Sequence, residues 1–171
     1  MRKFLPLLLA LLFIALLVAT IILVKRAGYA VTYQATSSMP RGLYLLAPVK
    51  SIARGDIVLF YPPITIRDFL KQQHWLPRSG LIMKYALGVP GDYVCRRQNE
   101  LWINRKKVAH IYHKTSSDLS LPQQKFCGKL GKTQYFLISI FVPNSFDSRY
   151  FGAVERGYIL GKAISINGKF Y

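Results

Sequence analysis

The sequence predicts a mainly β protein: an antiparallel β barrel or folded sheet, preceded by one N-terminal transmembrane helix. An uncharged apolar run from Phe4 to Val24 predicts the helix. After it, short apolar runs separated by Gly, Pro, Asn and Asp are typical of a β-rich domain. The chain has no internal repeat, and its 171 residues suit one such domain beside the helix. We therefore expect a membrane anchor over residues 1–26 and a single domain over residues 27–171.

The apolar run is long enough to cross a bilayer, because a helix of roughly 20 residues spans about 30 Å. Arg2-Lys3 precede it and Lys25-Arg26 end it. A cleavable signal peptide is the alternative, since Gly28-Tyr29-Ala30 offers small residues for a cleavage site. The apolar region of such peptides usually has only about 7–15 residues. We expect a retained anchor, and its balanced flanking charges leave the orientation open.

The rest of the chain can be divided into short elements. The candidate strands are Gly42–Ala47, Asp56–Tyr61, Leu81–Val89, Tyr93–Arg96, Gln134–Ile140 and Tyr158–Ile166. Residues 101–103 and 108–111 predict a hairpin. A helix is expected over Thr65–His74, with Thr65 and Asp68 as a capping box. The polar segment Lys114–Leu130 is expected to be a loop.

The charge of the chain is strongly positive. It has 24 Lys plus Arg against 7 Asp plus Glu, a net charge of +17. This charge suits nucleic acid or anionic lipid headgroups. Because the basic residues are mostly scattered, we expect a solvated basic surface beside a membrane, and no nucleic-acid partner.

The two cysteines, Cys95 and Cys127, are too few for a metal cage without histidine. In an oxidising compartment they predict one disulfide, which the chain-entropy model values at about 3–4 kcal/mol. In a cytosolic chain they would be buried thiols.

Several catalytic motifs are absent from the sequence. It has no Gly-x-Ser-x-Gly elbow, no phosphate-binding glycine loop and no His-Glu-x-x-His zinc motif. His110 and His113 would point to opposite faces of a strand, so we expect no metal site, and we expect no cofactor. The few acidic residues are dispersed, which disfavours a paired-carboxylate hydrolase, and no feature marks a histidine for a Ser-His-Asp triad. A serine with a different base is the remaining candidate chemistry.

Lys84 is the candidate base. It lies within the apolar segment Leu81–Leu87, where a strand would place it on one face with Ile82 and Ala86. Full burial can lower a lysine pKa by about 3–5 from its usual value near 10.4. An apolar strand can therefore turn this ammonium into an amine that is neutral at pH 7. A lysine that extends to solvent at a strand edge fits the pattern equally well.

Ser38 is the candidate nucleophile. It lies in a turn before Pro40-Arg41-Gly42 and close to the end of the anchor. Taken alone this signal is weak, because serine-rich turns are usually only turns.

Four segments together resemble the type I signal peptidases in order and spacing. They are Ser38-Met39-Pro40, Arg54–Val58, Lys84 with Pro90-Gly91-Asp92, and Ser145–Gly152. The similarity covers the anchor and nearly all of the remaining chain. Within that superfamily, the first and last segments are most similar to the conjugative-transfer peptidases of the TraF type. Those enzymes mature the pilin subunit of a conjugation pilus.

The resemblance implies a Ser/Lys dyad, in which Ser38 is the acylating nucleophile and Lys84 its general base. It also implies that Ser145 orients the Lys84 amine. The Ser38 backbone N–H, helped by the Thr36 hydroxyl, would form the oxyanion hole. The implied structural support is an ion pair that fixes the wall carrying Ser145, formed by Asp147 and Arg149.

Three departures from the signal peptidase pattern help to decide which branch of the superfamily the chain resembles. Pro40 follows Met39 directly, whereas general signal peptidases usually have one more residue between them. Tyr85 follows the lysine where arginine is common, and Ser139-Ile140 replaces the Gly-Asp that normally precedes the last segment. The first and third favour the conjugative branch, and the third leaves open which groups support Lys84 from behind.

The resemblance implies a serine endopeptidase in the bacterial inner membrane, with residues 27–171 in the periplasm. Its partners would be that membrane and a protein substrate, a pilin or another exported precursor. Release of the acyl-enzyme by water would give proteolysis, and release by the precursor's own α-amino group would give a cyclic product. The alternatives are a general signal peptidase and, from another class, an inactive anchored scaffold of a conjugation or secretion apparatus.

Overall fold

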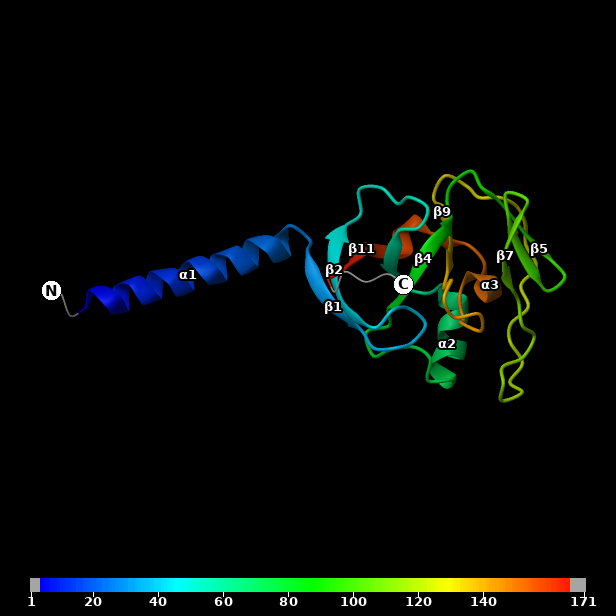
Figure 1. Ribbon diagram of the computed structural model, residues 1–171, viewed down its shortest axis with the longest axis horizontal. Helices are drawn as coiled ribbons and strands as arrows, with labels where there is room; N and C mark the ends of the chain where they lie inside the picture. Colours follow the sequence, from blue (N-terminus) through cyan, green and yellow to red (C-terminus); the bar gives the residue numbers. More distant parts are fainter. Residues whose placement is uncertain (1–3, 167–171) are drawn as a thin grey trace.

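A computed structural model describes residues 4–166, so residues 1–3 and 167–171 of the expected anchor and domain lie outside the described residues. A long helix leads into a β domain built from two sheets (Figure 1). The helices are α1 (Leu5–Arg26), α2 (Ile64–Gln72) and α3 (Ser148–Phe151), with a 3-10 turn at Arg156–Tyr158. The strands are β1 (Ala30–Gln34), β2 (Gly42–Pro48), β3 (Ile57–Phe60), β4 (Ile82–Gly88), β5 (Tyr93–Arg97), β6 (Glu100–Ile103), β7 (Lys106–His110), β8 (Cys127–Lys129), β9 (Gln134–Ile138), β10 (Val154–Glu155) and β11 (Ile159–Ser165).

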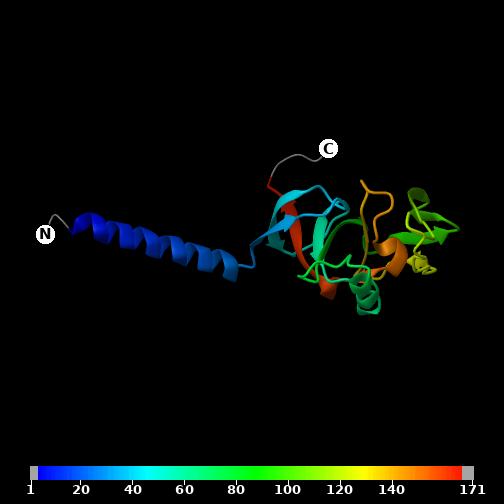
Figure 2. The same ribbon diagram turned by 90° about the horizontal axis from the view of Figure 1, so that it is seen from below.

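α1 has the length and apolar composition of a membrane span, and none of its residues is buried against the rest of the described chain. Its polar Thr20 hydroxyl donates to the Leu16 carbonyl at 2.8 Å, so it needs no water partner in lipid. Figures 1 and 2 show α1 leaving the domain beside β1 and β2, with β5 and β7 at the opposite end. The expected N-terminal apolar helix is therefore present.

The larger sheet has seven strands in the order β1-β2-β11-β3-β4-β9-β10, and every pair within it is antiparallel. The smaller sheet, β7-β6-β5-β8, is also antiparallel. The prediction of an antiparallel, mainly β fold is confirmed. The larger sheet ends in two edge strands, β1 and β10, so it is a folded sheet rather than a closed barrel.

β3 and β4 are central strands with apolar side chains packed on both faces. Val58 and Phe60 of β3 belong with Ala86 of β4 to one core cluster, whereas Ile57 and Leu59 pack with Met83 and Tyr85 in another. A third cluster lies between the smaller sheet and the end of β9. These layers cover the middle of β4, where Lys84 is located.

The expected strands and the expected helix are all present, but one detail of the helix was wrong. α2 begins at Ile64 after Pro63, and no side chain caps it. Thr65 therefore lies inside the first turn instead of at the N-cap, and Asp68 is 3.8 Å from Lys71 in an exposed pair. The proposed capping box does not form because the helix starts one residue before it.

The expected loop Lys114–Leu130 contains one short strand, β8. Cys127 of β8 is directly opposite Cys95 of β5 and bonded to it, so the predicted disulfide is present. The bond fixes the end of this segment to the smaller sheet.

Candidate active site

Lys84 lies in the middle of β4, opposite Val58 of β3, with 3% of its surface exposed. Its amine donates a hydrogen bond of 2.7 Å to the Ser145 hydroxyl. Burial lowers the Lys84 pKa from its ordinary value to about 8; the charge of Asp147 opposes this effect and that of Arg149 adds to it. Lys84 is therefore buried within the apolar strand and does not extend to solvent at a strand edge.

A pKa of about 8 is not low enough for Lys84 to be fully neutral at pH 7. With a pKa of about 8, roughly one tenth of the Lys84 side chains are neutral at pH 7 and about half at pH 8. A bound peptide that covered the amine would remove more water and lower the pKa further. The free protein thus holds an amine that is ready to act as a base in mildly alkaline solution.

Ser38 lies in the turn between β1 and β2, and Met39 next to it is 1% exposed in the core, where it anchors the turn. The Ser38 hydroxyl is 3.1 Å from the Thr36 hydroxyl. The Gln34 side-chain amide donates to the Thr36 hydroxyl at 2.6 Å, so the Thr36 proton is free to point toward Ser38. Either hydroxyl can be the donor in the contact between Thr36 and Ser38.

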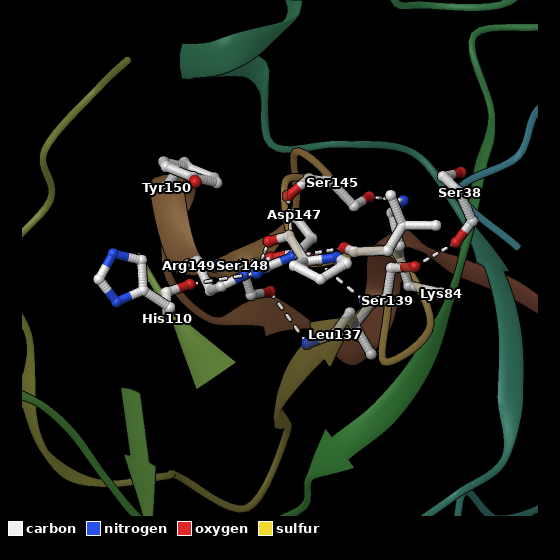
Figure 3. A network of polar contacts seen from close by, with 12 residues as sticks. Ser38, Lys84, His110, Leu137, Ser139, Ser145, Asp147, Ser148, Arg149 and Tyr150 are labelled. Carbon is white, nitrogen blue, oxygen red and sulfur yellow. Dashed lines mark hydrogen bonds and ion pairs between the residues drawn. The ribbon is translucent and has the colours of Figure 1, made fainter. Parts of the chain in front are cut away.

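The two residues of the expected dyad line the same cavity, of about 1200 Å³, which Ser145 also lines. In Figure 3 the Ser38 and Ser145 side chains lie on either side of the Lys84 amine. Among residues 4–166 no hydrogen bond joins the Ser38 hydroxyl to that amine; the hydroxyl contacts Thr36 and the amine donates to Ser145. In active sites without bound substrate, the hydrogen bonds between catalytic groups are often long or poorly aligned.

Asp147 and Arg149 form a buried ion pair behind Ser145. Asp147 is 0% and Arg149 1% exposed, and the guanidinium donates to both carboxylate oxygens at 2.8 Å. Arg149 also donates to the Ser145 carbonyl at 2.9 Å, and the Asp147 carboxylate accepts the Arg149 backbone N–H at the start of α3. The pair thereby holds the backbone that carries Ser145 in one conformation.

Ser139 was not among the site residues expected from the sequence, although its replacement of glycine was noted. It follows β9 and is buried. Its hydroxyl donates to the Ser38 carbonyl, and its backbone N–H donates to the Asp147 carboxylate at 3.0 Å. The replaced glycine was the only sequence signal for this contact, because residues 38 and 139 meet only in the folded chain.

The other two segments of the sequence motif stabilise turns outside the cavity. The Asp92 carboxylate accepts from Arg54 at 2.6 Å, from the Val89 N–H at 2.7 Å and from Asn104 at 2.7 Å. These bonds hold the pKa of Asp92 below its ordinary value although burial opposes them. Asp56 pairs with Lys162 at 2.7 Å. Neither carboxylate is among the residues that line the cavity.

A serine hydroxyl, a buried amine and a second hydroxyl beside one cavity suit acyl transfer through a covalent ester. The cavity wall includes residues of β1, the turn after it, β4, the segment after α2, Tyr112, residues 114–117 and residues 142–146. An extended peptide could therefore contact several separate segments of the chain at once. Ser38, Lys84 and Thr36 thus line one cavity together.

The chain is similar to several known proteins. The sequence model of the family described as "Signal peptidase, peptidase S26" matches residues 2–167. Signal peptidase I V of Bacillus subtilis (strain 168) is 30% identical over 122 residues, 66% of this chain and 64% of that protein. Plasmid transfer protein TraF of Escherichia coli is 31% identical over 137 residues, 73% of this chain and 76% of that protein.

A crystal structure of a signal peptidase I from Enterococcus faecalis V583 matches 67% of this chain and 97% of that chain, with 26% identity and a TM-score of 0.39. The alignment spans less than two thirds of the Bacillus protein. The family match covers nearly all of the chain, and together with the apolar α1 it indicates a membrane-anchored protein. The chain therefore belongs to the signal peptidase family, peptidase S26.

Proposed function

We propose that this protein is a membrane-bound serine endopeptidase with a Ser38/Lys84 dyad. The observation that carries the proposal is the buried Lys84 amine, whose pKa is lowered to about 8 and which borders the same cavity as Ser38. A lysine of ordinary pKa would be almost fully protonated at neutral pH and could not accept a proton. Burial in β4 is therefore what makes this lysine usable as a base.

The chemistry follows from these positions. The Ser38 hydroxyl leaves Thr36, gives its proton to the Lys84 amine and attacks the scissile carbonyl. The Ser38 N–H and the Thr36 hydroxyl stabilise the oxyanion, and the protonated Lys84 gives its proton to the leaving amine. An ester on Ser38 remains. Ser145 keeps the Lys84 amine pointed into the cavity throughout, because their hydrogen bond is made on the side away from Ser38.

For the substrate we propose an exported precursor, and among these a conjugative pilin. The similarity to plasmid transfer protein TraF supports this choice, as does the missing residue between Met39 and Pro40. The alternative is general removal of signal peptides, favoured by the similarity to signal peptidase I V. Depletion of the protein separates the two: loss of one mature pilin supports the proposal, whereas accumulation of many uncleaved precursors contradicts it.

The ester on Ser38 can be released by water or by the precursor's own α-amino group. Mass spectrometry of the mature product separates these outcomes, because a linear chain is one water heavier than the ring.

We propose for the location a single pass through the bacterial inner membrane, with the catalytic domain in the periplasm. Proteolysis of intact spheroplasts tests it: the domain should be digested from outside, and full protection would contradict the orientation.

The dyad is tested by making Ser38→Ala and Lys84→Ala separately and following precursor cleavage by the purified full chain in detergent. We expect each variant to lose activity by more than about 10³-fold, because neither acylation nor proton transfer can be replaced. Ser51→Ala and Lys71→Ala are matched controls at exposed positions away from the cavity. If Ser38→Ala or Lys84→Ala processes the precursor at the wild-type rate, the dyad is wrong and an inactive scaffold becomes the better interpretation.

A further inference from the structure

Ser139 connects the Ser38 segment to the buried ion pair. It is 3% exposed, and its hydroxyl donates to the Ser38 carbonyl while its backbone N–H donates to Asp147. Figure 3 shows Ser139 between Ser38 and Asp147 in this network. Since Asp147 is itself fixed by Arg149, the Ser38 carbonyl is attached to a rigid part of the core.

The register of the larger sheet explains why Ser139 can reach Ser38. β4 and β9 pair Tyr85 with Ile138 and Ala86 with Leu137, and continuing this register places Ser139 opposite Lys84. Residues directly opposite each other in an antiparallel pair point to the same face. Lys84 of β4 extends to Ser145, while Ser139, the first residue after β9, holds the Ser38 carbonyl.

We propose that Ser139 is a positioning residue that fixes the peptide group of Ser38 and thereby aims its hydroxyl at the Lys84 amine, an inference that rests on the proposed function. The Met39 side chain anchors this peptide group from one side in the core. The Ser139 bond fixes its carbonyl from the other. Ser139 does not line the cavity, so it acts through Ser38 and not by touching the substrate.

The contact is particular to the residue present at this position. The donor is the Ser139 hydroxyl, and a residue without a side-chain hydroxyl could not donate to the Ser38 carbonyl. Misplacement of a reacting group by about 1 Å can cost roughly 10²-fold in rate. Loss of the Ser139 hydroxyl should therefore reduce turnover without weakening substrate binding.

The test compares Ser139→Ala with Ser148→Ala in the full chain in detergent. Ser148 is a matched control: its hydroxyl is also buried and accepts the Leu137 N–H at 2.9 Å, and within residues 4–166 it has no hydrogen bond to Ser38. We expect Ser139→Ala to lower kcat by roughly 10- to 100-fold, with KM and the pH midpoint of activity unchanged. Hydrogen exchange should increase in residues 36–40 and not in residues 145–150. Ser148→Ala should keep the wild-type kcat and the slow exchange of residues 36–40.

Several outcomes would overturn the role of Ser139. A wild-type kcat in Ser139→Ala would do so, and so would an increase in exchange spread evenly over the domain, which indicates general destabilisation. A displaced pH midpoint would mean that Ser139 acts through Lys84 instead. Ser38→Ala in the same assay separates this failure from failure of the proposed function: only if that variant remains active is the dyad itself wrong.

Discussion

Replacing Asp147 with asparagine removes one charge from the ion pair beneath Ser145 and should reduce the stability of the domain. The guanidinium of Arg149 would remain buried without its counter-ion, and such a loss typically costs about 3–5 kcal/mol. We expect the free energy of unfolding to fall by about that amount. Asp68→Asn is the control, because Asp68 is 88% exposed in its pair with Lys71 and should contribute at most about 1 kcal/mol.

The same substitution should also change the pH dependence of activity. The charge of Asp147 raises the pKa of Lys84, whereas that of Arg149 lowers it. Without Asp147 the Lys84 pKa should fall below about 8, and the rising limb of kcat/KM should move to lower pH because the neutral amine is the active form. Urea unfolding followed by circular dichroism, and peptide cleavage as a function of pH, measure the two effects. A free energy of unfolding equal to that of Asp68→Asn would contradict the expected loss of stability. A rising limb of kcat/KM displaced to higher pH would contradict the expected fall in the Lys84 pKa.

Three further outcomes are expected. Between pH 7 and pH 9, kcat/KM of the wild-type protein should rise roughly tenfold as Lys84 loses its proton, because its pKa is about 8; a flat profile would argue against a lysine base. Ser145→Ala should lower kcat by roughly 10- to 100-fold with little change in KM, because the Lys84 amine loses its orienting partner; a wild-type kcat would remove Ser145 from the mechanism. The double substitution Cys95→Ser with Cys127→Ser should lower the free energy of unfolding by about 3–4 kcal/mol. In urea unfolding, a reductant should then destabilise the wild-type protein but not the variant, and an unaffected wild-type protein would be the contrary result.

The strong local patterns predicted most of the fold. The apolar runs at β3 and β4 and the long uncharged run of α1 were recognisable because burial on both faces, or lipid, requires continuous apolar sequence. β1 was missed for the opposite reason: its apolar residues, Val31 and Tyr33, are the exposed ones. β8 and β10 have only three and two residues, so their pairing depends on neighbouring strands and not on local propensity.

The candidate site was predictable only as far as its residues lie in recognisable segments. The sequence identified Lys84 as a candidate because it interrupts an apolar strand. The resemblance to signal peptidases implied that the Ser145 hydroxyl orients the Lys84 amine, and the two groups are hydrogen-bonded. It could not identify Ser139 as a partner of Ser38, since their contact depends on how the turn after β1 folds over the end of β9. Nor could it predict the size of the lowering of the Lys84 pKa, because nearby Asp147 offsets part of the effect of burial.

The most direct test of the Ser38/Lys84 dyad is to find the residue that carries the acyl group. The full chain in detergent would be mixed with an activated peptide ester, quenched in acid and mapped by mass spectrometry. We expect acylation at Ser38 in the wild-type protein, and acylation slower by more than about 10³-fold in Lys84→Ala. An acyl group on another residue, or equally fast acylation of Ser38 without the lysine, would contradict the dyad.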